Sequence, residues 1–224
     1  MNVETARFNM IEQQIRPWEV LDQGVLSLLS TVRREDFVPP ARRALAFVDT
    51  QVPLLEAQAR GPQMLEPKVE ARPLQELAVQ RHEKVLEIGT GSGFMAALLA
   101  HRAMQVITLE CRPELAARAR ENLRRAGLPD VQVLEVSADE GARGLPGEAP
   151  FDVIVLSGSV AEVPRALLEQ LRIGGRLVAI VGEAPVMRAR LMTRAGEASW
   201  SDVVLFDTLA PRLDGFPEPA RFRF

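Results

Sequence analysis

Residues 84–93, which read K-V-L-E-I-G-T-G-S-G, decide the fold of this chain. The first five form a short apolar run of the kind found in strands that are buried on both faces of a parallel sheet. Gly89, Gly91 and Gly93 then alternate with small hydroxyl residues, and an apolar, helix-forming run follows. The order strand, glycine turn, helix predicts a ligand site, because glycine permits positive φ and lets a ligand approach the backbone closely.

The spacing of the turn indicates which ligand fits. A dinucleotide site needs a small residue at the position of Phe94, where a pyrophosphate passes and the helix packs on the strand. Here that residue is large, and the acidic Glu87 stands two residues before the first glycine. The pattern acidic-x-Gly-x-Gly-x-Gly resembles motif I of the class I S-adenosylmethionine (AdoMet) methyltransferases. The resemblance implies that Glu87 meets the ammonium group of AdoMet and that N–H groups of the turn meet its carboxylate.

Two more acidic residues follow predicted strands. Glu110 ends the run 105–110, about 20 positions after the first glycine of the turn, where a carboxylate can accept hydrogen bonds from both ribose hydroxyls. Asp139 follows the run 131–136 and can accept from the exocyclic amine of adenine. A plain strand-end charge at Glu110 and a helix cap at Asp139 are the alternatives. The motif as a whole implies a cofactor site that contains Glu87, Gly89, Thr90, Gly91, Gly93, Glu110 and Asp139.

The order of the remaining elements predicts an α/β fold, a Rossmann-like doubly wound sheet with one antiparallel strand, as in AdoMet methyltransferases. Helical runs alternate with strand-like runs, and a hairpin follows at the end of the chain. We expect an N-terminal helical extension with a proline-rich substrate or lid loop in 1–66, and the AdoMet-binding domain in 67–224, as one compact unit. The predicted strands are 84–88, 105–110, 131–136, 151–156, 176–181, 186–193 and 202–208.

Composition limits the partners. The 224 residues are 47% hydrophobic and 25% charged with a net charge of −3, and the arginines are spread along the chain, so no nucleic-acid partner is expected. No run approaches the ~18 apolar residues of a membrane span. The chain also lacks the core of a signal peptide, so the expected location is cytoplasmic, without a membrane partner. Cys111 is the single cysteine and the two histidines are isolated, which excludes a disulfide framework and predicts no metal site.

Longer segments narrow the resemblance. The chain resembles the protein-L-isoaspartate O-methyltransferase family over nearly its full length. This implies transfer of a methyl group from AdoMet, with S-adenosylhomocysteine (AdoHcy) as product, to the abnormal carboxylate of isoaspartyl residues in damaged proteins. An ionised carboxylate needs no general base at pH 7. The segments that carry the resemblance are 10–18 (M-I-E-Q-Q-I-R-P-W), 34–39 (R-E-D-F-V-P), 85–93, 113–122, 149–155 and 162–177 (E-V-P-R-A-L-L-E-Q-L-R-I-G-G-R-L).

The substrate side departs from the family pattern. The family loop G-Q-T-I-S-x-P reads G-P-Q-M-L-E-P at 61–67, so that Gln63 and Leu65 replace the usual hydroxyl residues. After the predicted strand 151–156, Leu156 takes the place of a threonine, and Ser157 opens a predicted loop. Gln63, Leu65 and Ser157 are therefore the candidate substrate positions, with Gln63 or Ser157 as a replacement donor. Two alternatives stay open: a methyltransferase of this fold with another acceptor, and a protein that binds AdoMet or AdoHcy without chemistry.

Overall fold

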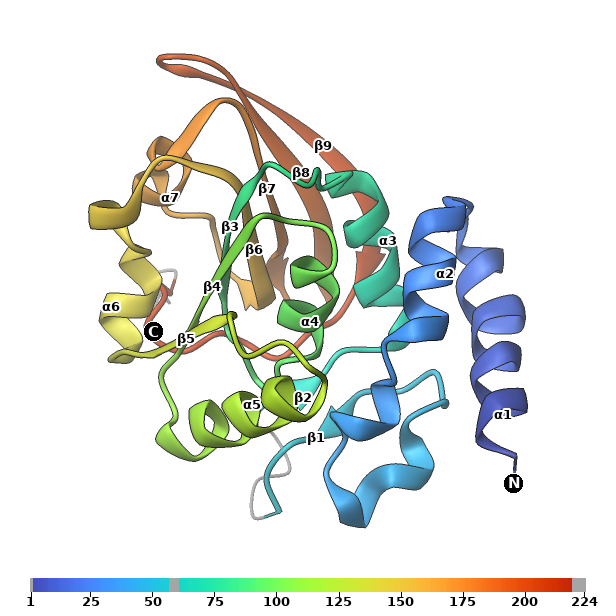
Figure 1. Cartoon of the computed structure of the whole chain (residues 1–224). Helices are drawn as coiled ribbons and strands as arrows, with labels where there is room; N and C mark the ends of the chain where they lie inside the picture. Colours follow the sequence, from blue (N-terminus) through green and yellow to red (C-terminus); the bar gives the residue numbers. More distant parts are fainter. Residues whose placement is uncertain (1, 57–60, 219–224) are drawn as a thin grey trace, which may run out of the picture.

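The core of the protein is a seven-stranded sheet, seen in a computed structural model that describes residues 2–56 and 61–218 (Figure 1). The strand order is β5–β4–β3–β6–β7–β8–β9. The strands from β3 to β7 run parallel to one another, and β8 runs antiparallel to both of its neighbours. The predicted doubly wound sheet with one antiparallel strand is thus confirmed. The bounds are β3 Lys84–Ile88, β4 Gln105–Glu110, β5 Gln132–Glu135, β6 Phe151–Val160, β7 Leu171–Glu183, β8 Val186–Gly196 and β9 Ser199–Thr208.

The strand order reverses beside β3. β4 and β5 extend the sheet on one side of β3, and β6 and β7 extend it on the other. Glu87 pairs with Thr108 of β4 and with Val155 of β6, so the carboxyl ends of these three strands lie together. Ligands of open α/β sheets bind at such a switch point, outside the carboxyl ends of the strands.

Helices cover the sheet, and those of the N-terminal extension stand at one end of the molecule beside α3 (Figure 1). Asp22 caps α2 by accepting a hydrogen bond from the N–H of Val25 at 2.7 Å. Proline at the start of α3 and of α5 needs no N–H partner there. The helices are α1 Val3–Met10, α2 Gln23–Thr31, α3 Pro67–Leu77, α4 Phe94–Ala100, α5 Pro113–Arg125, α6 Ala138–Arg143 and α7 Arg165–Glu169.

Short elements join these helices and strands. A π-helical turn continues α1, and four 3-10 turns mark the remaining breaks. Two paired strands, β1 and β2, fall in the part of 1–66 where the proline-rich substrate or lid loop was expected, of which residues 57–60 lie outside the described part. The short elements are η1 Ile11–Ile15, η2 Arg16–Trp18, η3 Arg34–Asp36, η4 Pro40–Leu45, η5 Pro146–Glu148, β1 Val52–Pro53 and β2 Gln63–Met64.

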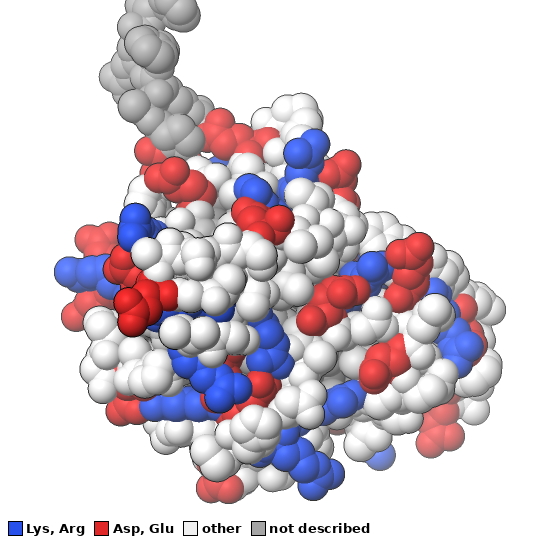
Figure 2. Space-filling model, turned by 90° about the horizontal axis from the view of Figure 1, so that it is seen from above, with Lys and Arg blue, Asp and Glu red and all other residues white. Residues whose placement is uncertain are grey.

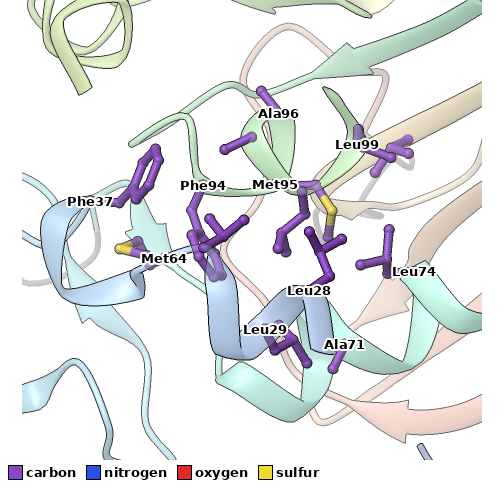
Figure 3. Packing of buried hydrophobic residues seen from close by; sticks show 14 of the residues in the cluster. Leu28, Leu29, Phe37, Met64, Ala71, Leu74, Phe94, Met95, Ala96 and Leu99 are labelled. Atoms are coloured by element: carbon purple, nitrogen blue, oxygen red, sulfur yellow. The ribbon is translucent and has the colours of Figure 1, made fainter. Parts of the chain in front are cut away.

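The N-terminal helices share a hydrophobic core with the sheet. Leu28 of α2 points towards Met95 of α4 and Leu74 of α3, and Leu29 lies beside Ala71 of α3 (Figure 3). All five side chains are buried. Because each buried side chain of this size contributes roughly 1.5–3 kcal/mol, this contact fixes α3 and the first turn of α4 relative to each other.

Three expectations about local structure are wrong, each because of pairing between distant segments. Residues 157–160, predicted as a loop, continue β6, since Ser159 and Val160 pair with β7 after a shift in register. The glycine pair Gly174–Gly175 predicts a turn, but both residues lie inside β7, where a second register shift accommodates them. The sequence of residues 162–171 predicts a helix, which shortens to α7 because β7 begins at Leu171, paired with Phe151 of β6.

The segment that follows β9 returns across the carboxyl edge of the sheet. Ser159 donates its N–H to the Pro211 carbonyl at 2.7 Å and accepts from the Leu213 N–H at 2.9 Å. Phe216 is buried in the same hydrophobic cluster as Ile88 and Leu109. This return segment, residues 209–216, therefore forms a wall beside the ends of β3, β4 and β6.

Charged side chains are mixed over the surface. On the face in Figure 2, acidic and basic residues are intermixed. Ion pairs between partly exposed side chains include Arg190–Asp202 at 2.5 Å. In the described parts of the chain, no helix is long and apolar enough to cross a membrane.

Candidate functional site

Two adjoining cavities meet at the glycine turn. The edge cavity lies over the carboxyl ends of β3 and β4 and is closed on one side by the return segment. The inner cavity lies between the turn, α3 and the strands β6 and β7. The residues that line both cavities are Leu54, Gln63, Gly89, Gly91 and Ser157.

The glycine turn has the geometry that its sequence requires. Gly89, Gly91 and Gly93 have φ values of +92°, +55° and +84°, a region that other residues rarely adopt. Gly93 occupies the N-cap position of α4, so the last of the three glycines converts the turn into a helix. The turn therefore brings the chain from the end of β3 into α4 without a side chain projecting at these positions.

Side chains of the protein approach the turn where a ligand was expected. A Cβ atom added to Gly89 would lie 2.7 Å from Leu213 Cδ2, and one added to Gly91 would lie 3.1 Å from Leu54 Cδ1. Both neighbours are the ends of flexible side chains, and both residues line the edge cavity. The turn is thus a cradle that a side chain at either glycine would fill.

Glu110 is bound to this turn. Its Oε2 accepts the Gly91 N–H at 2.8 Å, and its Oε1 accepts the Arg112 N–H at 3.0 Å. Burial raises the pKa of the carboxyl group, more than its backbone hydrogen bonds lower it. Each carboxylate oxygen has a second lone pair, so Glu110, which lines the edge cavity, can still accept from two hydroxyls.

Glu87 lies beneath the turn and is fully buried. Its Oε2 accepts from the Thr108 hydroxyl at 2.7 Å and its Oε1 from the Ser157 hydroxyl at 2.6 Å. Thr90, which carries a hydroxyl in the turn, is 2.7 Å from the Thr108 hydroxyl and so extends this network. Burial raises the pKa of Glu87 to about 8, although both hydroxyls lower it and Glu70 and Glu110 raise it further.

Asp139 is not part of either cavity wall. It stands exposed in the first turn of α6, where Ala138 and Gly141 line the edge cavity instead. The helix cap is also formed by other residues, because Ser137 and Glu140 make a capping box. The structure therefore brings together Glu87, Gly89, Thr90, Gly91 and Glu110 around the two cavities, with Gly93 behind them and Asp139 at the rim.

The three substrate-side positions meet in the inner cavity. Gln63, Leu65 and Ser157 all line it, although they come from β2, the following loop and β6. The Ser157 hydroxyl already donates to Glu87. No described residue hydrogen-bonds the Gln63 side-chain amide. Of the three, Gln63 thus has the donor that remains available.

Sequence reasoning missed two residues of this cavity, Arg34 and Glu70. Glu70 lines the inner cavity with 5% of its surface exposed, and Arg34, at 1%, lies behind it. Arg34 donates to Glu70 and to the carbonyl oxygen of Leu65. The signal was in the helical pattern, because Glu70 falls on the same face of α3 as Leu74 and Leu77, where an acid is out of place.

The lining of the inner cavity suits a reaction that needs little water. Its walls are mostly apolar, and among the described residues its ionisable side chains are Glu70 and Glu87, with no Lys, Arg or His. Hydroxyl groups of Thr90, Ser92 and Ser157 surround the turn. The cavity therefore offers a mostly apolar surface with two carboxyl groups and several hydroxyl groups beside the turn.

Comparison with known proteins identifies related chains. A sequence profile of the family described as protein-L-isoaspartate(D-aspartate) O-methyltransferase matches residues 5–206. A protein-L-isoaspartate O-methyltransferase of Methanoculleus marisnigri is 42% identical over 176 residues, 79% of this chain and 77% of that protein. Protein-L-isoaspartate O-methyltransferase 2 of Marinobacter nauticus is 39% identical over 208 residues, 90% of this chain and 92% of that protein.

Solved structures agree with the fold. A Plasmodium falciparum protein described as a protein-L-isoaspartate O-methyltransferase, crystallised in complex with S-adenosyl-L-homocysteine, superposes with a TM-score of 0.77. The superposition covers 96% of this chain and 99% of that chain at 18% sequence identity. At this identity, the likeness supports the fold alone.

Proposed function

The chain belongs to the protein-L-isoaspartate(D-aspartate) O-methyltransferase family, and from this premise we propose how its two cavities divide the reaction. The protein is an AdoMet-dependent O-methyltransferase. Its acceptor is the free carboxylate of an isoaspartyl residue in a protein or peptide. The observation that supports this most is the junction of the two cavities at Gly89 and Gly91, which lets a nucleoside side and an acceptor side share one boundary.

The residues around the edge cavity fit the cofactor. Glu110, oriented by the N–H groups of Gly91 and Arg112, would hold the ribose hydroxyls. Glu87, which lies beneath the turn and lines the inner cavity, would lie opposite the ammonium group where the two cavities meet, and the glycines leave room for the methionine part. Asp139 would contact adenine from the rim, which requires its exposed side chain to turn towards Ala138.

The inner cavity supplies alignment and exclusion of water. When bound, AdoMet supplies a methyl group activated by the neighbouring sulfonium. Leu65, Phe94 and Leu156 surround the acceptor with apolar surface, where attraction between a carboxylate and a cation is stronger than in water. An isoaspartyl carboxylate is ionised at pH 7, so the chain needs to position it rather than deprotonate it. Gln63, whose amide is not used by a described residue, would donate to this carboxylate.

A methyl-transfer assay tests the proposal. Labelled AdoMet is incubated with a synthetic peptide that contains one isoaspartyl residue, and the same peptide with ordinary aspartate serves as the blank. We expect labelling of the first peptide and none of the second, together with release of the label by mild alkali, as for a carboxyl methyl ester. Labelling of both peptides would show another acceptor, and no labelling would contradict the activity.

A cofactor titration separates the two halves of the proposal. Calorimetric titration with AdoHcy measures the edge cavity without an acceptor. Saturable binding at one site per chain is expected, with loss of binding in Glu110→Ala. Binding of AdoHcy without transfer to the isoaspartyl peptide would leave the cofactor assignment standing and remove the acceptor assignment.

A further inference from the structure

Glu70 is a buried carboxyl group that the reaction described so far does not use. It belongs to α3 and lines the inner cavity. Arg34 donates to its Oε2, and no described residue hydrogen-bonds its Oε1. This second oxygen is not among the fully buried unpaired atoms of the described residues, so it is open to the cavity, where a ligand can bind it.

The acceptor loop lacks the donors that a carboxylate ligand needs. Residues 61–65, which read G-P-Q-M-L, contain no hydroxyl side chain. The side chain of Leu65 lines the cavity but cannot donate, and the Ser157 hydroxyl is used by Glu87. An acceptor carboxylate has about four lone-pair sites on its two oxygens, and the two N–H groups of the Gln63 amide can fill at most two of them.

We propose that Glu70 binds the acceptor as a protonated carboxyl group, and that its O–H donates to the oxygen of the isoaspartyl carboxylate that does not attack the methyl group. This inference rests on the proposed function and names its acceptor-binding residue. The proton stays on Glu70 throughout, so no further reactant is needed. A donor to the attacking oxygen would withdraw charge from it, which is why the other oxygen is the one that is bound.

Arg34 is the positioning residue for this contact. Its three donor nitrogens reach the Ala46 carbonyl at 3.1 Å, the Leu65 carbonyl at 2.6 Å and the carboxyl group of Glu70. Its guanidinium group also lies 5.1 Å from the centre of the Phe94 ring, directly after the glycine turn. Arg34 thus holds the acceptor loop, Glu70 and the start of α4 in one arrangement.

The surroundings of Glu70 favour the protonated form. Charged groups face it from three directions: Arg34 of η3, Glu87 of β3 and Glu66 at the start of its own helix. β7 and β8 present only apolar side chains to the cavity. Burial raises the pKa of Glu70 to about 7, against the lowering effect of Arg34, and Glu66 raises it further. An acceptor carboxylate that enters the cavity raises the pKa of Glu70 again, because two neighbouring negative charges repel each other.

The decisive measurement is the pH profile of Glu70→Gln. Glutamine keeps the shape of the side chain, an oxygen for Arg34 and an N–H donor, but it does not titrate. At saturating AdoMet, kcat/KM for the isoaspartyl peptide should fall in the parent protein as the pH rises through the neutral range. In E70Q, kcat/KM for the peptide should not change with pH over this range and should remain within about threefold of the value that the parent shows at low pH.

Glu70→Leu removes the donor altogether. We expect kcat/KM for the peptide to fall roughly ten- to hundred-fold, mainly through KM. The KM for AdoMet and the affinity for AdoHcy should stay within about twofold. Binding of the peptide to the AdoHcy complex, measured by calorimetry, should weaken by the same factor as kcat/KM. If E70L does not fold because the Arg34 guanidinium is left buried without its partner, the double variant Arg34→Met, Glu70→Leu removes the guanidinium together with the carboxyl group and is measured instead.

Glu35→Gln is the matched control. Glu35 is the neighbour of Arg34 in sequence, is 7% exposed and pairs with Arg7, but it lines neither cavity. The inference is overturned if E35Q reproduces the profile of E70Q, if E70Q loses as much as E70L, or if E70L keeps the kinetics of the parent. If the parent transfers no methyl group, the proposed function fails, and peptide binding to the AdoHcy complexes of the parent and E70L still decides the role of Glu70.

Discussion

The edge cavity and the inner cavity differ in how the chain builds them. The edge cavity stands on the adjoining ends of β3 and β4 and on the turn that follows β3, so its main groups lie at fixed distances along the sequence. The inner cavity is assembled from η3, β2, α3, β6 and β7, which are far apart in the chain. The proposed cofactor site can therefore be predicted from one sequence motif, whereas the proposed acceptor site is revealed only by the tertiary contacts between distant segments.

The largest effect is expected at the turn, in Gly89→Ala. A methyl group there meets Leu213 at 2.7 Å and a φ of +92°, which costs alanine about 1–2 kcal/mol before any contact is counted. We expect AdoHcy affinity to fall by more than about 100-fold, and isothermal calorimetry measures it. The corresponding change at Gly147, beside which nothing lies within 4 Å, is the control and should leave binding unchanged. Normal affinity in Gly89→Ala would show that the cofactor does not use the turn.

The next effect compares the two acidic residues assigned to the nucleoside. Glu110→Ala should weaken AdoHcy binding roughly ten- to hundred-fold, because one carboxylate serves two hydroxyls and is buried against Gly91. Asp139→Ala should change it by less than about threefold, since that side chain is exposed at the rim. The two titrations are done in the same buffer. Equal or reversed losses of affinity would contradict the assignment of Glu110 to the ribose and Asp139 to the adenine.

The third effect is a pH dependence at the boundary between the cavities. The pKa of Glu87 is raised to about 8 in the free protein, so the group is protonated at pH 7, whereas contact with an ammonium group favours its carboxylate. Cofactor binding then releases a proton. AdoHcy affinity should rise with pH, by up to about tenfold per unit, until pH 8 and then level off. Titrations in buffers of different ionisation enthalpy detect the proton, and Glu87→Gln should release none. Proton release that persists in this variant would assign it to another group.

The smallest effect separates Gln63 from Ser157. Gln63→Ala should raise the KM for the isoaspartyl peptide by about three- to tenfold and leave AdoHcy affinity alone, because it removes one neutral donor. Ser157→Ala should weaken AdoHcy binding and leave the peptide KM unchanged, since the Ser157 hydroxyl donates to Glu87. Steady-state kinetics give the peptide KM of each variant, and calorimetry gives its AdoHcy affinity. A raised peptide KM in Ser157→Ala alone would transfer the donor role to Ser157.

Most of the fold followed from local pattern. The bounds of β3 and β4 were predicted correctly because apolar runs there end at glycine or at a charged residue. The end of β6 was predicted wrongly because Ser159 is held by β7 and by the return segment, neither of which is near it in sequence. The periodicity of apolar residues and the residues that flank them predict the locally encoded part of a strand. They do not predict an extension that depends on pairing with a segment far away in the sequence.

The site was predictable to a similar depth. The sequence placed Glu87 and Glu110 beside the glycine turn because strand-end acids at this spacing are a strong signal, and their roles towards the cofactor stay predictions. The direction of the Asp139 side chain was not, since it depends on the capping box at Ser137. The contact between Arg34 and Glu70 spans 36 positions and has no periodic signature, so only the folded chain reveals it.

The return segment has a practical consequence for anyone who prepares this enzyme. Leu213 lies beside the turn and Phe216 is buried beside the edge cavity, so a label attached to the carboxyl-terminal segment 209–216 would lie against the proposed cofactor site. The opposite terminus begins at α1, on the far side of the molecule (Figure 1). Fusion partners, surface attachment for biosensors and fluorescent labels therefore belong at the amino end.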